Sequence, residues 1–130
     1  MVQSALREAT VTFDNFLGME TKRIDGGAEV RLEIKEQTLN KGGIVHGGVI
    51  CSLVDQAIGA AVHFALGRGR RAVTVELKLN FLAPSTSGTL IARGRLIREG
   101  QNLLVGEAEI LDLDGRMIAK GLGTWTIIQQ

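Results

Sequence analysis

The strongest constraint on the fold is an apolar run over residues 49–66, which is followed by several stretches of alternating apolar and polar residues. Asp55, Gln56 and His63 interrupt the run and argue against a membrane-spanning helix, because each is costly in lipid. Its apolar residues recur around most of a helical wheel, and such a helix is buried on nearly every side. These apolar residues are Val49, Ile50, Leu53, Val54, Ala57, Ile58, Ala61, Val62, Ala65 and Leu66. We therefore expect one long core helix that ends near Gly67 and Gly69.

The remaining segments have the patterns of strands. Residues 28–36 alternate apolar and charged side chains, as a half-buried strand does. A second, unbroken alternation covers 73–81, and Pro84 ends it. Two further strands, 89–98 and 103–113, flank a turn at 99–102; Asp114-Gly115 predicts the next hairpin turn before a last strand at 117–128. A short helix is also indicated up to about Phe16, ending near Gly18.

This order of elements predicts an α+β fold, in which an antiparallel sheet of five to six strands wraps around one long central helix. At 130 residues, and with no repeat or linker, the chain fits a single domain over 1–130. One helix covers only one face of such a sheet. We expect part of the remaining apolar surface to be covered by a second copy of the chain.

Composition removes several classes of function. The chain has 15 Lys and Arg against 14 Asp and Glu, which argues against a nucleic-acid binder. Cys51 is the single cysteine, so no intrachain disulfide is possible; we interpret it as a small core residue and expect no metal site and no cofactor. Arg7 and Glu8 stand where an export signal needs an apolar core. We expect a cytoplasmic protein without a membrane partner.

Asp55 is the residue most suggestive of chemistry, because it lies in the middle of the apolar helix. An ionised group buried without partners costs several kcal/mol, roughly. Two interpretations follow from the residues alone. Asp55 either lies on a narrow polar stripe or in a structural hydrogen bond, or it is a catalytic carboxylate.

The segment His46-Gly47-Gly48 lies where this helix should begin. The first N–H groups of a helix have no internal partners and lie at the positive end of its dipole. They can stabilise a carbonyl oxygen that becomes negative in a transition state, and glycine lets a substrate come close. A flexible loop before a helix is the plainer alternative. Cys51 is five positions from His46, so the two are not placed for Cys/His catalysis.

Together these segments resemble a known family. NKGGIVHGGVICSLVDQAIGAA followed by TVELKLNFLAP is similar to the PaaI-type acyl-CoA thioesterases of the hot-dog superfamily, and the likeness extends over about residues 13–127. The decisive features are the nine-residue spacing from His46 to Asp55 within a helix and the V-x-L-x-L-x-F-L-x-P strand after it. The resemblance implies hydrolysis of an acyl-CoA, with the acyl group left open.

The resemblance also implies roles for individual residues. Asp55 acts as general base or as nucleophile. The backbone N–H of Gly47 polarises the thioester carbonyl, and His46 orients that loop. Asn40 matches a residue that positions water or substrate in some members, and Thr74 matches a recurring hydroxyl at the start of the next strand.

For coenzyme A, the resemblance implies a nucleotide end held at the surface by loops and scattered basic residues. The candidates are Arg98, Gly100, Asn102 and Arg71, with Gln101 and Arg70 beside them. The family also suggests a homodimer, often paired into a tetramer. Gly47 and Asp55 are eight residues apart, roughly 12 Å along a helix, so we expect each site to combine Gly47 of one chain with Asp55 of another.

Two other functions remain open at this point. One is a hot-dog hydratase or dehydratase acting on enoyl thioesters, for which His46 and Asp55 superficially offer the usual histidine and carboxylate. The other is a non-catalytic module that binds acyl-CoA. Loss of enoyl-CoA absorbance distinguishes the first, and binding without release of thiol distinguishes the second.

Overall fold

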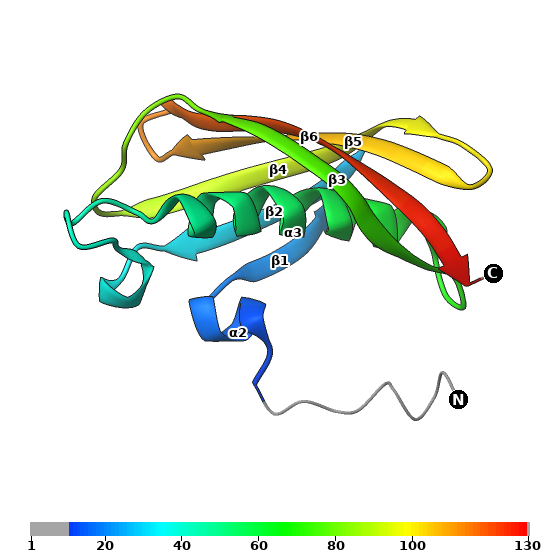
Figure 1. Ribbon diagram of the computed structural model, residues 1–130, viewed down its shortest axis with the longest axis horizontal. Coiled ribbons are helices and arrows are strands. Elements are labelled where there is room, and N and C mark those ends of the chain that lie inside the picture. The colour runs from blue at the N-terminus through cyan, green and yellow to red at the C-terminus, as the bar shows by residue number, and fades with distance from the viewer. Residues whose placement is uncertain (1–10, 130) are drawn as a thin grey trace.

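The computed structural model describes residues 11–129, and its core is a six-stranded antiparallel sheet curved around one long helix (Figure 1). The sheet order is β1-β2-β4-β5-β6-β3. The elements are α2 (Phe13–Leu17), β1 (Glu20–Ile24), β2 (Gly27–Glu33), the short 3₁₀ helix η1 (Glu36–Thr38), α3 (Gly47–Leu66), β3 (Arg71–Phe81), β4 (Thr89–Glu99), β5 (Leu103–Asp112) and β6 (Met117–Gln129). The predicted α+β architecture is confirmed, with six strands.

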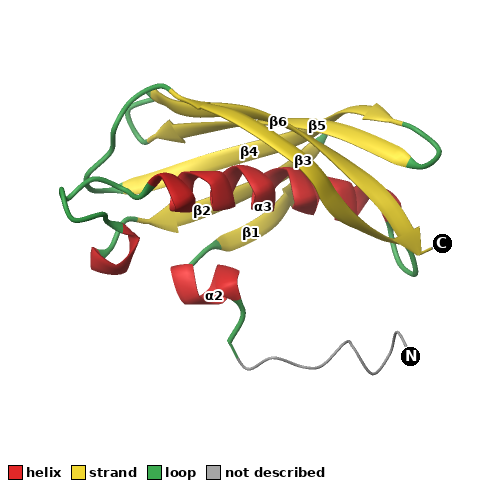
Figure 2. Cartoon of the chain, viewed as in Figure 1, coloured by secondary structure: helices red, strands yellow, loops and turns green. Residues whose placement is uncertain are grey.

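Helix α3 lies along the concave face of the sheet (Figure 2). Nine of the ten apolar residues singled out in the sequence are buried there, but Ala65 is exposed. The expectation of burial on nearly every side is therefore wrong for the single chain. The sheet covers one side of α3, and an outer stripe that includes Ser52, Asp55, Gly59 and Ala60 is only half-buried.

Glycines on the sheet let α3 pack unusually close. A Cβ atom on Gly94 of β4 would lie 2.4 Å from the backbone oxygen of Ala57, and one on Gly121 of β6 would lie 2.8 Å from Val54 Cγ1. Any side chain there would push the helix off the sheet. The main core, which includes Leu53, Val54 and Ile58 with strand residues facing them, depends on this close contact.

The N-terminal part of the sheet differs from the prediction. β1 was not predicted, because its segment Glu-Thr-Lys-Arg-Ile has no apolar alternation. It pairs with β2 as an edge hairpin. β2 ends at Glu33, short of the predicted end at Glu36, which belongs to η1. α2 ends at Gly18 as expected, with φ +82°. The earlier part of that helix, and the stretch expected to hold no export signal, lie outside the described residues.

β3 also departs from a simple hairpin succession. It pairs with β6 at the edge of the sheet, so the connection over residues 82–88 carries the chain across to β4, which joins β2. The alternation predicted for 73–81 is broken by a bulge between Thr74 and Glu76. A bulge reverses the side-chain alternation. Thr74 therefore faces α3, on the same side as Leu77.

One carboxylate is buried outside the helix. Glu29 on β2 is 5% exposed and lies among Arg93, Arg31 and Lys22, with Arg93 Nε 3.2 Å from its Oε1. Burial raises the pKa of Glu29, but hydrogen bonds from Arg93 and Arg31 and the charge of Lys22 together leave that pKa below its usual value. The ionised carboxylate thus joins the three neighbouring strands β1, β2 and β4.

We predict that Glu29→Gln lowers the free energy of unfolding by about 1–2 kcal/mol at pH 7, the scale of a hydrogen bond to a charged group. The pKa of Glu29 is lowered by folding, so ionised Glu29 stabilises the wild type above its unfolded pKa, about 4.5. This contribution is lost as the pH falls through the folded value. Urea unfolding at pH 7 and at successively lower pH should show the gap between wild type and variant closing in acid. A gap that stays constant would contradict this account.

Candidate active site

His46 caps the N-terminus of α3. Its backbone is extended, with φ −60° and ψ 137°, and its Nδ1 accepts a hydrogen bond of 2.8 Å from the N–H of Gly48. A Cβ atom on Gly48 would lie 3.0 Å from that same nitrogen, so glycine gives the imidazole room to turn back over the helix end. His46 is therefore the N-cap of α3, and its role in orienting the loop for catalysis stays a prediction.

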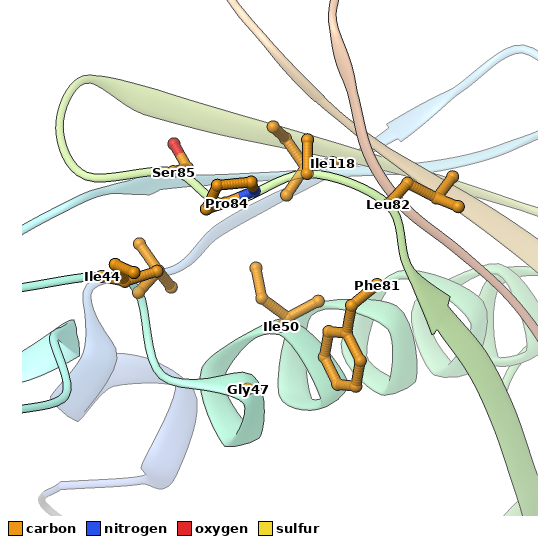
Figure 3. Close-up of a pocket in the computed structure, with 10 residues that line it drawn as sticks. Ile44, Gly47, Ile50, Phe81, Leu82, Pro84, Ser85 and Ile118 are labelled. Atoms are coloured by element: carbon orange, nitrogen blue, oxygen red, sulfur yellow. The ribbon is translucent and has the colours of Figure 1, made fainter. Parts of the chain in front are cut away.

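The N–H of Gly47 has no hydrogen-bond partner among the described residues. The imidazole of His46 accepts its hydrogen bond from the following residue, Gly48. Gly47 also forms part of the wall of a cavity of about 360 Å³ between the start of α3 and the β3–β4 connection (Figure 3). The ring of Phe81 lies beside it, 3.4 Å from where a Cβ atom would stand. The unpaired N–H and the cavity wall thus meet at the same residue.

Asn40 shapes the loop that leads into the cap. Its Oδ1 accepts hydrogen bonds from the N–H groups of Gly42, at 2.8 Å, and Ile44, at 3.1 Å. The side-chain oxygen is therefore committed to the loop 40–44. If Asn40 positions water or substrate as predicted, its amide nitrogen is the group left to do so. The side chain is exposed.

Asp55 lies at the second centre, near the middle of α3. Thr74 Oγ1 donates a hydrogen bond of 2.8 Å to Asp55 Oδ1, which the bulge in β3 makes possible. Both residues line a cavity of about 380 Å³ that also contains Trp125. Asp55 is half-buried, so the polar-stripe interpretation and the hydrogen-bond interpretation both describe part of its surroundings. One oxygen, Oδ2, is left for a reacting group.

The structure does not bring Gly47 and Asp55 together within one chain. They line different cavities that share no residue. Eight residues of helix separate them, roughly 12 Å along the axis, whereas a reacting carbonyl must lie about 3 Å from its donor. A single chain therefore presents two incomplete halves of a site.

The candidate residues for coenzyme A gather at one end of the sheet, near the C-terminal end of α3 (Figure 1). Arg71 begins β3 opposite Gln129 of β6, and the carbonyl of Asn102 accepts the N–H of Ile127 on the same part of β6. Gly100 shares the β4–β5 turn with Asn102, and Arg98 precedes it at the end of β4. The cavity around Asp55 is the nearer of the two to this end.

Several residues around Asp55 were not predicted. Thr21 from β1 and Gln56 line the cavity and are joined by a hydrogen bond of 3.2 Å. Trp125 is buried and packs over Gly59. Arg23 lies 5.7 Å from the ring centre of Phe64, another cavity residue. The Asp25-Gly26 turn signal could have located β1, and with it Thr21 and Arg23.

Comparison with known proteins identifies the family. The family model described as "Thioesterase superfamily" matches residues 42–119, more than half of the chain. The chain belongs to the thioesterase superfamily. The match includes the His46 cap, Asp55, and the β3 strand that carries Thr74. The likeness to this superfamily's hot-dog fold, expected from the sequence, is confirmed.

Individual relatives agree with this membership. A protein of Saccharolobus solfataricus, named provisionally as an esterase, is 37% identical over 89% of this chain and 77% of its own. The E. coli PaaI protein from the phenylacetic acid degradation operon is 29% identical, with a TM-score of 0.81 over 88% of this chain and 83% of that one. A Bacillus halodurans protein solved with CoA is 28% identical, with a TM-score of 0.86 over 99% and 86%. This thioesterase-superfamily chain thus shares the PaaI fold almost throughout.

The His46 cap can be tested with two glycines of α3. We predict that Gly48→Ala lowers stability by about 1 kcal/mol, because its methyl group displaces the capping imidazole. The matched control is Gly59→Ala, whose Cβ would meet Trp125 at an ordinary 3.7 Å. It should raise helix stability by up to about 1 kcal/mol. Equal effects of the two changes in chemical denaturation would show that the cap is unimportant.

Proposed function

We propose that this member of the superfamily hydrolyses acyl-CoA thioesters to a free acid and coenzyme A. The observation that carries the proposal is that one helix bears two groups: an N–H at Gly47 that is unpaired among the described residues, and the carboxylate of Asp55, which accepts a hydrogen bond from Thr74. The superfamily supports thioester hydrolysis in general, and the CoA-bound relative supports coenzyme A as the carrier. A cytoplasmic location stays a prediction.

In the proposed reaction, Asp55 removes a proton from water while the resulting hydroxide attacks the thioester carbonyl carbon. The carbonyl oxygen becomes negative and accepts a hydrogen bond from Gly47 N–H, where the dipole of α3 also favours negative charge. Collapse of the intermediate breaks the carbon–sulfur bond, and the departing thiolate receives the proton that Asp55 took from water. In the nucleophilic alternative, Asp55 attacks the carbonyl carbon directly and expels coenzyme A as the thiolate, and water then hydrolyses the resulting anhydride.

Thr74 gives Asp55 a fixed orientation. Its hydroxyl donates to Oδ1, so Oδ2 is directed by geometry to the water or carbonyl. Thioesters are activated enough that one positioned carboxylate and one oxyanion donor suffice, without a Ser-His-Asp set. No histidine has to act as base. The Nδ1 of His46 is occupied by the cap.

We propose further that each active site is shared by two chains of a homodimer. The edge of β3 supports this assembly: the strand has 11 residues, pairs on one side only among the described residues, and exposes Val73, Val75 and Phe81. A long apolar edge strand is normally covered. The opposite edge, β1, has five residues and is mostly polar, so it is protected.

A two-fold axis beside β3 would join two β3 edges in antiparallel fashion and set the outer stripes of two α3 helices against each other. The stripe includes Ser52, Gly59 and Ala60, and the exposed Gly48 lies one turn before Ser52; these small residues permit close helix approach. In antiparallel helices, Asp55 of one chain lies near Gly47 of the other. A further pairing of such dimers into a tetramer stays a prediction.

The proposed path of coenzyme A follows from the same arrangement. Its thioester end lies between Gly47 and the partner chain's Asp55 cavity, and its phosphates extend toward the basic end of that chain. Arg71 and Arg98, with the turn at Gly100 and Asn102, are the proposed phosphate contacts there. Arg23 joins them as a candidate because its guanidinium lies against Phe64, which lines the cavity.

Removing the carboxylate tests the chemistry. We predict that Asp55→Asn and Asp55→Ala each lower kcat for acyl-CoA hydrolysis by at least about a hundredfold, as expected for a lost base or nucleophile. Asn keeps an acceptor for Thr74, so the fold and the cavity should survive. Thiol release is the assay and circular dichroism the control. Near-normal turnover by a folded Asp55→Asn protein would refute the assigned role.

Complementation tests the shared site. Gly47→Pro removes the proposed donor at the first helical position, where proline is tolerated, and the extended backbone of His46 suits a following proline. Gly47→Pro and Asp55→Ala proteins should each be nearly inactive. Unfolded, mixed equally and refolded, they should form mixed dimers in about half the population, so about a quarter of all sites regain both groups.

The matched control for this experiment mixes Asp55→Ala with Thr74→Ala. These two residues belong to the same half-site, so every site of a mixed dimer keeps one defect and activity should not return. Native mass spectrometry verifies that mixed dimers form. Recovery in neither mixture, despite mixed dimers, would mean that Asp55 acts within its own chain.

A further inference from the structure

The cavity beside Gly47 has a composition that distinguishes it from the one beside Asp55. It measures about 360 Å³, and none of the described residues that line it is charged. Ile44, Ile50, Phe81, Pro84 and Ile118 contribute apolar surface, and Ser85, with its hydroxyl, is the one polar side chain in this part of the described structure (Figure 3). Ile50 and Ile118 are almost fully buried, so the inner wall is part of the rigid core.

We propose that this cavity holds the acyl group of the substrate, and that the substrates are therefore uncharged, apolar acyl-CoA thioesters of medium length or with a single aromatic ring. The inference rests on the proposed thioesterase function and adds its substrate class. The position of Gly47 in the cavity wall orients the ligand: with the carbonyl oxygen on this N–H, one substituent of the carbonyl carbon enters the cavity and the other points away.

The backbone of the cavity shows why the acyl group, and not the pantetheine arm, enters. That arm carries two amides, which need hydrogen-bond partners when they leave water. Most N–H groups around the cavity are already taken: Ile44 donates to Asn40, Val45 to the carbonyl of Ser85, and Leu82 and Ala83 to that of Ile118. Gly47 is left for the thioester oxygen.

The Asp55 cavity is the better place for the arm. It contains the polar side chains of Thr21, Gln56, His63 and Thr74, and it lies toward the basic end of the chain. The apolar acyl group therefore occupies the cavity beside Gly47, and the polar pantetheine arm occupies the cavity beside Asp55. Each cavity then comes from a different chain of the proposed dimer.

The size of the cavity limits the acyl group. About 360 Å³ lies near the lower end of the range for small-molecule sites, about 300–1,000 Å³. We expect an optimum between roughly six and ten carbons. Below that optimum, each added methylene should raise kcat/KM by about fourfold, the gain from burying one CH₂ group. Beyond it, kcat/KM should level off or fall.

Two substitutions should move this optimum in opposite directions. Ala83→Leu fills part of the cavity from the half-buried β3–β4 connection, and Ile44→Ala removes part of the outer wall. We expect Ala83→Leu to lower kcat/KM for the longest accepted chain by at least about tenfold more than it lowers kcat/KM for acetyl-CoA. Ile44→Ala should shift the optimum to longer chains. The matched controls, Ala65→Leu and Leu113→Ala, alter exposed positions outside this cavity and should leave the profile unchanged.

Charge gives an independent arm of the test. Succinyl-CoA and butyryl-CoA have the same number of acyl carbons, but succinyl carries a carboxylate that the cavity cannot pair. We expect kcat/KM for succinyl-CoA to be at least about tenfold lower in the wild type. Equal rates for the two substrates would overturn the proposal, because they would place the acyl end in a polar environment.

Binding separates this inference from the proposed activity. A series of S-alkyl-CoA thioethers, which cannot be hydrolysed, is titrated by calorimetry against the wild type and both cavity variants. If affinity depends on chain length and the preferred length shifts in opposite directions in Ala83→Leu and Ile44→Ala, the acyl cavity is supported. This conclusion would hold even if no thioester released thiol, a result that would refute only the thioesterase proposal. If thioesters are hydrolysed but neither variant moves the optimum in rate or affinity, the acyl group binds elsewhere and the inference is wrong.

Discussion

The packing of α3 against the concave face of the sheet decides where every functional group of this chain lies. Because Gly94 and Gly121 lack side chains, the helix approaches β4 and β6 so closely that its inner side is sealed in the core. The rotation of the helix about its own axis is then fixed. Asp55 is held on the outer stripe, and the N–H of Gly47, unpaired among the described residues, belongs to the wall of an apolar cavity.

Close packing also explains how the helix can carry a carboxylate without losing stability. A fully wrapped helix would bury Asp55, at a cost of several kcal/mol, roughly. The half-wrapped helix leaves it half-buried, where a single hydroxyl from Thr74 orients it. Glu29 shows the other solution on the same sheet: it is almost fully buried, and three cations surround it. Glu29 therefore holds strands together, whereas Asp55 keeps one carboxylate oxygen available to a reacting group.

Sequence patterns predicted the parts of the fold that depend on local periodicity. The apolar run located α3 to within two residues at its start, and the turns at 99–102 and Asp114-Gly115 located the hairpins. β1 could not be found by this reasoning, since its pairing with β2 makes it a strand and its own residues do not alternate. The bulge in β3 is equally invisible, because it arises from the register with β6. Asp55 stood out from its neighbours alone, whereas its partner Thr74 was suggested only by family resemblance.

The geometry of a straight helix links catalysis to association in the proposed enzyme. The oxyanion donor must be at the start of α3, where unpaired N–H groups exist, and the carboxylate must be far enough along for β3 to hold it. No rotamer of Asp55 closes the resulting gap of roughly 12 Å. The strand that positions the carboxylate is also the one whose apolar edge is unpaired among the described residues. Covering that edge with a second copy would therefore complete both sites in one step, and a dissociated chain would keep its fold elements while lacking a functional site.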